Sequence, residues 1–269
     1  MKKIYVLYLS TKYSSIDSLK KFVNNYKKYK SGIKHQLIVC FKNLDSKELI
    51  VRKKILSQIN YYGYIDPSLK NDHEFGSIKR VSKKFNSGII FYMNDSSYPI
   101  KNNWLNIITS IYKRNTIIGC SASMSSWATN SYFRKLGDNY IVYLYKLIYF
   151  NLFVPKFPNP HLRFNGLLFH SSDYLKFIKK KIVKNRMNAY VLESGYQGFT
   201  NFFKSKKYRI FVVNSDGKIF KEKDWKISNT YSYKNQDKLL ISDHNTRNYL
   251  KLNKKKKIKE QIKTWGNIS

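Results

Sequence analysis

The stretch IIFYMNDSSYPIKNNWL, from Ile89 to Leu105, decides how the fold of this chain is interpreted. Five apolar or aromatic residues run directly into Asn94 and Asp95, and small polar residues and Pro99 follow. Such a run is typical of a strand that is buried on both faces of a sheet. The chain has only 16 acidic residues among 269. A carboxylate at the end of a buried strand is costly unless it is paired or bound to a cation, so Asp95 needs a partner.

The flanking segments alternate between the strand period and the helix period. Strands are predicted at 3–10, 35–41, 87–93 and 116–123, and helices at 16–29, 49–59, 74–85 and 104–112. Residues 63–67 are predicted to be a polar turn. This alternation predicts an α/β fold with a mostly parallel sheet covered on both faces. Ligands bind such sheets at the carboxyl ends of strands, where the strand order reverses. Asp95 stands at such an end.

The second half of the chain is less regular, and neither a repeat nor a linker divides it. The segment 154–166 holds three prolines and is predicted to be irregular. Residues 140–155 are apolar but carry Lys146 and are shorter than the about 20 residues of a membrane span, so we expect a core or interfacial helix. Residues 191–213 indicate a loop, a helix and a strand.

The charge of +35, from 51 basic and 16 acidic residues, first suggests an anionic partner. Only eight of the basic residues are arginine, the side chain best suited to bidentate recognition of phosphates and bases. We therefore expect any nucleic-acid binding to ignore sequence, and a general attraction to anionic membranes to be stronger. Cys40 and Cys120 fit no zinc or redox spacing and are expected to be buried thiols of a cytoplasmic protein.

The order strand, helix, strand, followed by residues 74–105, resembles the GT-A glycosyltransferases, especially the large inverting group that builds bacterial polysaccharides. In that group a glycine and an arginine precede a strand, which ends in an Asp-x-Asp-like motif followed by a proline and a Trp-Leu pair. The residues that carry the resemblance are Gly76, Arg80, Asp95, Pro99, Trp104 and Leu105.

The resemblance implies a single GT-A-like domain over 1–250, with a nucleotide-sugar-binding half at 1–123 and an acceptor-side half at 124–250. It implies sugar transfer from a nucleotide-sugar donor to a glycan or lipid-linked acceptor in surface polysaccharide synthesis. The implied donor-binding residues are Gly76, Arg80, Asn94, Asp95 and Ser97. A non-catalytic, lysine-rich protein that binds nucleic acid or anionic membrane is the alternative function.

In the resembling group, the acidic motif holds a divalent cation, Mn or Mg, which would here be bound by Asp95. The motif has lost its second carboxylate, because the chain reads Asn94-Asp95-Ser96-Ser97. The hydroxyl of Ser97 is then a weak candidate ligand, and the basic surface an alternative source of charge for the diphosphate. A purely structural alternative is that Asp95 caps the next helix or closes an Asx turn.

Glu193 is the candidate general base. The resembling group places an acidic pair before a helix, and the second acid usually deprotonates the acceptor hydroxyl. This chain has Glu193-Ser194 there. Three alternatives remain open: Glu193 has taken the role, the correspondence is shifted by one residue, or the chain is not a standard inverting enzyme. As a structural alternative, Glu193 is a helix N-terminal carboxylate that the helix dipole favours.

Two further segments are candidates for binding substrate or phosphate. His161, Arg163 and Asn165 occupy alternate positions, which share one face of an extended segment. Their chemistry suits a pyrophosphate or an acidic sugar. The second segment is predicted to fold back over the donor site, and some GT-A enzymes have a late metal-binding histidine. Its candidates are Asp243, His244 and Arg247, and a simple turn is the alternative.

The basic tail, 251–269, carries Ile258, Ile262 and Trp265 at helical spacing among lysines. This pattern indicates an amphipathic helix for anionic lipid headgroups, with a frayed terminus as the alternative. We therefore expect a cytoplasmic protein with a peripheral contact to the inner face of the cell membrane.

Overall fold

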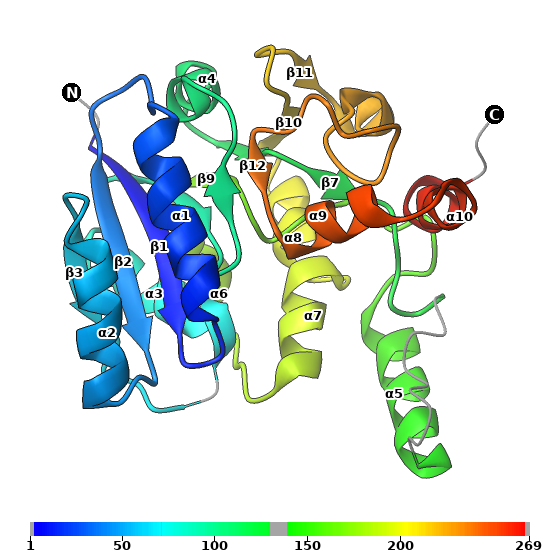
Figure 1. Ribbon diagram of the computed structural model, residues 1–269. Coiled ribbons are helices and arrows are strands. Elements are labelled where there is room, and N and C mark those ends of the chain that lie inside the picture. The colour runs from blue at the N-terminus through cyan, green and yellow to red at the C-terminus, as the bar shows by residue number, and fades with distance from the viewer. Residues whose placement is uncertain (1–2, 71, 130–138, 267–269) are drawn as a thin grey trace.

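The structure is a computed structural model that describes residues 3–70, 72–129 and 139–266 (Figure 1). Within these residues the centre of the fold is an eight-stranded sheet in the order β11-β10-β6-β9-β4-β1-β2-β3. Its strands are β1 (Ile4–Thr11), β2 (Gln36–Lys42), β3 (Tyr62–Ile65), β4 (Ile89–Met93), β6 (Thr116–Gly119), β9 (Leu167–His170), β10 (Arg209–Val213) and β11 (Ile219–Phe220). Strands β3, β2, β1 and β4 run parallel, as do β6 and β10, whereas β9 runs antiparallel between β4 and β6. The predicted mostly parallel α/β sheet is confirmed.

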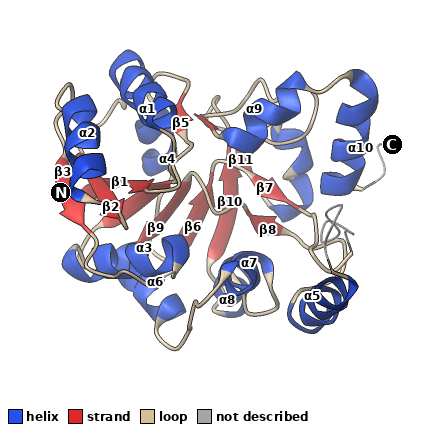
Figure 2. Cartoon of the chain, turned by 60° about the horizontal axis from the view of Figure 1, so that its bottom comes forward, coloured by secondary structure: helices blue, strands red, loops and turns tan. Residues whose placement is uncertain are grey.

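Helices cover both faces of the sheet, as Figure 2 shows. One face packs against α1 (Ile16–Lys28), α2 (Ser46–Leu56) and α4 (Trp104–Ser110). The other packs against α3 (His73–Lys84), α6 (Ser171–Ile178), α7 (Arg186–Ser194) and α8 (Phe199–Ser205). Side chains of β1 alternate between the two cores, with Val6 and Tyr8 in the first and Leu7 and Leu9 in the second. This double burial explains the continuous apolar runs of β1 and β4.

Three boundaries differ from the sequence prediction. Residues 62–65 form the edge strand β3, where a polar turn was expected, and only alternate residues of β3 are partly buried. The single strand expected at 116–123 is divided into β6 and β7 (Ala122–Ser123). Helix α2 begins at Ser46, three residues before the prediction, because Asp45 and Glu48 form a reciprocal capping box.

Two short antiparallel pairs lie outside the main sheet, and one of them includes the C-terminal segment. Strand β5 (Tyr98–Pro99) pairs with β12 (Ile241–Ser242), directly after the loop that ends β4. Strand β7 pairs with β8 (His161–Leu162). Helices α9 (His244–Lys251) and α10 (Lys254–Trp265) follow β12. The loop at Asp95 is therefore held between the sheet and the last quarter of the chain.

Helix α5 (Tyr140–Phe153) projects from the body of the molecule (Figure 1). Phe150 is its one buried residue, and it packs with Trp127 and Tyr190. Of the two alternatives predicted for this segment, the core helix is therefore wrong, and the interfacial helix stays a prediction. Across 3–70, 72–129 and 139–266, no helix has both the length and the apolar character needed to cross a membrane.

The tail forms the helix α10, but its expected apolar stripe is not exposed throughout. Ile258 and Ile262 are exposed, whereas Trp265 is buried and donates a hydrogen bond from Nε1 to the carbonyl of Tyr231. The prediction that Trp265 faces a membrane is therefore wrong, because this indole anchors α10 to the body. The two cysteines are free and buried, as expected.

Candidate functional site

A cleft at the carboxyl ends of the strands contains two connected chambers. The sheet-end chamber encloses about 560 Å³ beside the ends of β1, β2 and β4, where Thr11, Asn43 and Asp95 line it. The outer chamber encloses about 590 Å³ and is lined by Trp127 and His161, among others. The residues that line both chambers are Glu74, Asn94, Phe164, Arg186, Tyr190 and Glu193. These shared residues make the chambers two parts of one cleft.

Asp95 faces the sheet-end chamber and has few polar partners. Its Oδ2 accepts a hydrogen bond from Thr11 Oγ1 at 3.3 Å, and its backbone carbonyl accepts one from Tyr8 at 2.8 Å. Among the residues that the structure describes, the carboxylate has no ion-pair partner. Burial raises the pKa of Asp95 above its ordinary value, although the hydrogen bond from Thr11 opposes this effect.

The turn after β4 is closed by Asn94 rather than by Asp95. Asn94 Oδ1 accepts hydrogen bonds from the backbone N–H and the hydroxyl of Ser96, both at 3.1 Å, and from the hydroxyl of Ser97. The N-cap of α4 is Asn103. Asp95 therefore serves neither of the structural roles that the sequence left open for it.

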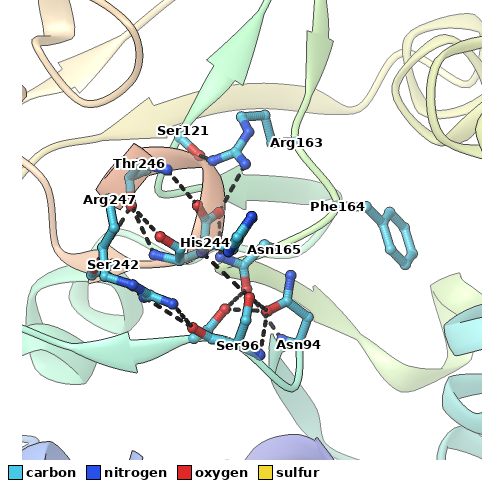
Figure 3. Close-up of polar contacts among 12 residues, drawn as sticks. Asn94, Ser96, Ser121, Arg163, Phe164, Asn165, Ser242, His244, Thr246 and Arg247 are labelled. Atoms are coloured by element: carbon cyan, nitrogen blue, oxygen red, sulfur yellow. Dashed lines mark hydrogen bonds and ion pairs between the residues drawn. The ribbon is translucent and has the colours of Figure 1, made fainter. Parts of the chain in front are cut away.

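A buried polar network supports this turn (Figure 3). Asn165 Oδ1 accepts from the backbone N–H of Asn94 at 3.1 Å and from Ser97 Oγ at 2.7 Å, and Asn165 Nδ2 donates to Asp243 at 3.1 Å. Asp243 forms an ion pair of 2.8 Å with Arg163. Ser97 is fully buried and lines neither chamber, so it supports Asn94 instead of contacting a donor.

The C-terminal segment folds back onto the same turn. Arg247 donates from Nη1 and Nη2 to the carbonyl of Ser96, at 3.0 and 3.1 Å, and lies over the ring of Tyr98. Asp243 caps α9 in a reciprocal capping box with Thr246. His244 is exposed, lines neither chamber, and has Nε2 hydrogen-bonded to Asn248 at 2.7 Å. Asp243 and Arg247 thus support the turn from outside the chambers, whereas the side chain of His244 lies on the surface; none of the three lines a chamber.

His161, Arg163 and Asn165 all line the outer chamber, as their alternation predicts. His161 Nδ1 is 2.7 Å from the carbonyl of Asn159, and burial lowers the pKa of His161, which keeps the ring neutral near pH 7. The guanidinium of Arg163 lies 3.8 Å above the ring centre of Tyr231 and is paired with Asp243. Arg163 is therefore committed to a buried network, whereas His161 borders the cleft.

Arg80 lies in a second buried cluster, with two carboxylates that the sequence prediction missed. Its Nε and Nη2 donate to Asp66 at 2.6 and 2.7 Å, and its Nη1 donates to Asp72 at 2.6 Å. Lys42 also pairs with Asp72. Burial alone would raise the pKa values of Asp66 and Asp72. The hydrogen bonds and charge of Arg80, together with contacts from Ser77 and Ser68 to Asp66 and from Lys42 to Asp72, outweigh burial and hold both pKa values below the ordinary value. Gly76 packs against this cluster, since a Cβ there would lie 2.0 Å from the Asp72 carboxylate.

Neither Arg80 nor Gly76 lines a chamber, so the cluster shapes the ends of β2 and β3 beside the cleft. The sequence resemblance implies that these two residues contact the nucleotide, but neither of them lines the cleft. Asp66 stands within the segment predicted as a polar turn, and nothing in the local sequence connects it to an arginine 14 residues later.

Glu193 and Glu74 bring two further carboxylates to the shared wall. Glu193 lies in the last turn of α7, so it is not the helix N-terminal acid of the structural alternative. Its Oε1 accepts a hydrogen bond from the backbone N–H of Phe164 at 2.9 Å. Glu74, which the sequence prediction missed, lies in the first turn of α3. Burial, followed by the negative charges of Glu193 and Asp95, raises the pKa of Glu74 to about 7.

The side chains at the cleft do not fit a metal ion held by the protein alone. Within the described part of the chain, no three histidine, cysteine, aspartate or glutamate residues gather with the spacing of a metal site. Asp95 is the one carboxylate in this turn. The side-chain oxygen of its neighbour, Asn94 Oδ1, already accepts hydrogen bonds from Ser96 and Ser97. Divalent cations in proteins generally need further oxygen ligands.

No protein-family model matches the sequence, and no curated protein matches it either. Solved structures that are similar in fold include the mannosyltransferase PcManGT from Pyrobaculum calidifontis in complex with GDP-Man and Mn2+, at 8% identity and a TM-score of 0.47 over 82% of this chain and 56% of that chain. S. aureus TarS 1-349 in complex with UDP is similar at 13% identity and a TM-score of 0.45 over 96% of this chain and 69% of that chain. The 4-diphosphocytidyl-2C-methyl-D-erythritol synthase from Anaerococcus prevotii is similar at 12% identity and a TM-score of 0.44 over 79% of this chain and 88% of that chain.

These similar structures include nucleotide-sugar glycosyltransferases, as the resemblance in the sequence predicts. The chain spans little more than half the length of the first of them. Because their TM-scores are below 0.5, the activity of this chain is inferred from the residues of the cleft and not from these structures.

Proposed function

We propose that this protein transfers a sugar from a nucleotide-sugar donor in the sheet-end chamber to an acceptor hydroxyl in the outer chamber. The observation that carries this proposal is the convergence of Glu74, Asp95 and Glu193 on one cleft, in a chain with only 16 acidic residues. A lysine-rich binding protein would need a contiguous basic stripe, and has no use for three carboxylates around a cavity. The raised pKa values of Glu74 and Asp95, two carboxylates that line this cleft, are typical of a functional site.

On the donor side, Asp95 accepts hydrogen bonds from hydroxyl groups of the nucleotide sugar, and thereby orients it. The exposed guanidinium of Arg186 lines both chambers and supplies positive charge for the diphosphate. Because the donor set does not fit a resident metal, no step depends on a cation. Mn or Mg, if it enters, comes with the donor and takes oxygen ligands from the phosphates.

On the acceptor side, Glu193 is the general base. The hydrogen bond from the Phe164 N–H fixes one carboxylate oxygen on the wall between the chambers. In a direct displacement, the acceptor oxygen bonds to the anomeric carbon and transfers its proton to Glu193. The bond from that carbon to the phosphate oxygen breaks, and the nucleoside diphosphate leaves with the electron pair. A glycan or lipid-linked acceptor of surface polysaccharide synthesis is the substrate class that the sequence resemblance favours.

The test combines donor binding with turnover. Calorimetry with a panel of nucleoside diphosphates, with and without Mn, should find at least one that binds. We expect Asp95→Asn to weaken this binding and turnover, and Glu193→Gln to keep binding while turnover falls about 10²–10⁴-fold. Asp237→Asn, an exposed carboxylate outside both chambers, is the matched control and should behave as the wild type.

Four results would contradict the proposal. Absence of binding by every nucleotide would remove the donor site, and unchanged turnover in Glu193→Gln would remove the base. Unfolding of Asp95→Asn would show that Asp95 is a structural residue after all. Tight, salt-sensitive binding of nucleic acid without nucleotide binding would favour the lysine-rich binding protein instead.

A further inference from the structure

We propose that Arg52 is a buried positive charge that balances the donor diphosphate in the sheet-end chamber, and that it positions the loop at residues 11–14 beside that chamber. The inference rests on the proposed function and adds a residue of α2 to the same site. Only 3% of Arg52 is exposed, whereas its neighbours Lys53 and Lys54 are exposed. Arg52 lines neither chamber, so it acts through the loop and through its charge.

The guanidinium of Arg52 is hydrogen-bonded to the end of β1 and to the loop that follows it. Its Nη1 donates to Ser10 Oγ at 3.2 Å and to Ser14 Oγ at 3.3 Å, and its Nη2 donates to the carbonyl of Ser14 at 2.7 Å. Ser14 Oγ also accepts a hydrogen bond from the backbone N–H of Thr11 at 2.9 Å. Thr11 lines the sheet-end chamber, and its hydroxyl donates to Asp95. Arg52 therefore holds the segment that presents Thr11 to the chamber.

These hydrogen bonds do not require a charge, and the charge of Arg52 is not balanced by a carboxylate. Among the residues that the structure describes, Arg52 forms no ion pair, and its buried Nε has no hydrogen-bond partner. Arg80 and Arg163, which are also largely enclosed, both pair with carboxylates. A buried charge without a partner is strongly destabilising. Because a neutral glutamine could donate to Ser14 without that cost, the charge of Arg52 favours an anion bound nearby as its partner.

The charge of Arg52 acts on the wall of the sheet-end chamber. Burial raises the pKa of Asp95, whereas the hydrogen bond from Thr11 and the charge of Arg52 oppose this effect. Burial and the charge of Asp95 raise the pKa of Tyr8, and Arg52 again opposes the rise. A charge that is kept away from water is screened little, so it acts over a longer distance than an exposed charge. Arg52 is therefore placed to attract an anion that enters beside Asp95.

A diphosphate in the sheet-end chamber needs positive charge, because carboxyl groups already line this space. The acidic lining residues are Glu74, Asp95 and Glu193. Lys42 also lines the chamber, but its ammonium group is paired with Asp72. Arg186 is exposed, so water and salt screen its charge. A buried guanidinium behind the end of β1 complements Arg186 and favours a ligand with a high negative charge.

The test compares two substitutions of Arg52 by calorimetry. Arg52→Gln removes the charge but keeps an N–H donor, whereas Arg52→Lys keeps the charge. Lys53→Gln is the matched control, because it removes the same charge from an exposed neighbour on the same helix. The probes are inorganic pyrophosphate and the diphosphate, the monophosphate and the uncharged nucleoside of the base that binds the wild type. All affinities are measured in buffer without a divalent cation.

The effect of Arg52→Gln should grow with the charge of the ligand. We expect this variant to bind the diphosphate and pyrophosphate at least about tenfold more weakly than the wild type, and the nucleoside within about twofold of it. The monophosphate should lie between them. Arg52→Lys should keep the ratio of diphosphate to nucleoside affinity, and Lys53→Gln should match the wild type with every probe. A displaced loop would weaken the binding of the uncharged nucleoside as well, so this comparison separates the charge from the support of the loop.

Three outcomes would overturn the inference. Equal weakening of diphosphate and nucleoside binding in Arg52→Gln would show that Arg52 only supports the loop, and wild-type affinity for the diphosphate would show that it balances no anion. Unfolding of Arg52→Gln, seen by circular dichroism, would show that the guanidinium serves the fold. The pyrophosphate measurements separate this inference from the proposed function. Pyrophosphate binding that Arg52→Gln weakens, in a protein that binds no nucleotide, refutes only the transferase proposal, whereas a wild type that binds neither probe refutes both.

Discussion

The buried ion pair between Arg163 and Asp243 holds the wall of the cleft, and its removal should destabilise the protein strongly. Asp243 Oδ2 lies 2.8 Å from Arg163 Nη2 and accepts a hydrogen bond from Asn165, whose own carbonyl oxygen supports Asn94. Asp243 Oδ1 accepts from the backbone N–H of Thr246 and so caps α9. The two substitutions Asp243→Asn and Asp243→Ala separate the charge from the cap.

The magnitude follows from the burial of the pair, since the side chains of Arg163 and Asp243 are 10% and 2% exposed. Removing one partner leaves an uncompensated buried charge, which costs about 3–5 kcal/mol. Asparagine caps helices as well as aspartate does, so Asp243→Asn should lose only this amount. Asp243→Ala should lose about 1 kcal/mol more, because the cap is also removed.

The same pair predicts a pH dependence. Burial alone would raise the pKa of Asp243, but the charge of Arg163 and the hydrogen bonds outweigh it and hold the pKa below the ordinary value of 3.8. The stabilisation is therefore fully present above the unfolded pKa and is lost as the pH falls through the folded pKa. Asp243→Asn should approach the stability of the wild type in that acidic range.

Urea unfolding, followed by tryptophan fluorescence and circular dichroism, measures these differences. The matched control is Asp216→Asn, since Asp216 pairs with Lys238 on the surface with 39% of its side chain exposed. Surface pairs contribute about 0–1 kcal/mol, so the control should change little. The reasoning is refuted if the free energy of unfolding of Asp243→Asn lies within about 1 kcal/mol of the wild type at neutral pH, because a buried unpaired guanidinium should destabilise the protein by more than that.

Two further substitutions test the cleft and the cluster beside it. The raised pKa of Glu74, about 7 against an ordinary 4.5, means that the folded state holds a proton which the unfolded state has lost, so the stability of the wild type falls as the pH rises through this window. Glu74→Gln should lack that slope and gain in melting temperature relative to the wild type between about pH 5 and pH 8; parallel pH profiles would count against the buried carboxyl. Gly76→Ala should lower the free energy of unfolding in urea by about 1–3 kcal/mol, because its Cβ would lie 2.0 Å from the Asp72 carboxylate that Arg80 holds. Gly63→Ala, whose Cβ would meet no atom closer than 3.4 Å, is the control, and equal effects at the two glycines would contradict the steric explanation.

The strands and helices with strong local periodicity could be predicted from the sequence. Strand β4 consists of five residues that are all buried, so its apolar run had one sensible interpretation. Helix α1 follows Ser15, which caps it, and buries Leu19, Phe22 and Val23 on one face. In both elements the tertiary contacts agree with the local pattern, so the local sequence is enough to predict them.

Elements that depend on distant partners could not be predicted in this way. Strand β3 is short and half exposed, contains Gly63, and exists because it pairs with β2, where Ile38 lies opposite Tyr62. The resemblance implies a nucleotide contact for Arg80, and its carboxylate partners Asp66 and Asp72 lie in segments with no local signal that would predict the cluster. Glu74 escapes prediction for the same reason, since its raised pKa arises from burial and from the charges of Glu193 on α7 and Asp95 in the turn after β4, which only the fold brings near.

The structural contacts at the end of β4 are made by residues other than Asp95. Its neighbour Asn94 closes the turn, Asn103 occupies the N-cap position of α4, and Arg163 and Arg247 bind Asp243 and the Ser96 carbonyl. Asp95 makes none of these contacts. Asp95 keeps a partly buried carboxylate with one hydrogen bond of 3.3 Å, and its raised pKa shows that the folded state disfavours the charge. A residue that weakens its own fold while facing a chamber is the local inconsistency expected of a binding site. Among the described residues the carboxylate has no ion-pair partner, which supports the proposed role of Asp95 in orienting a bound nucleotide sugar.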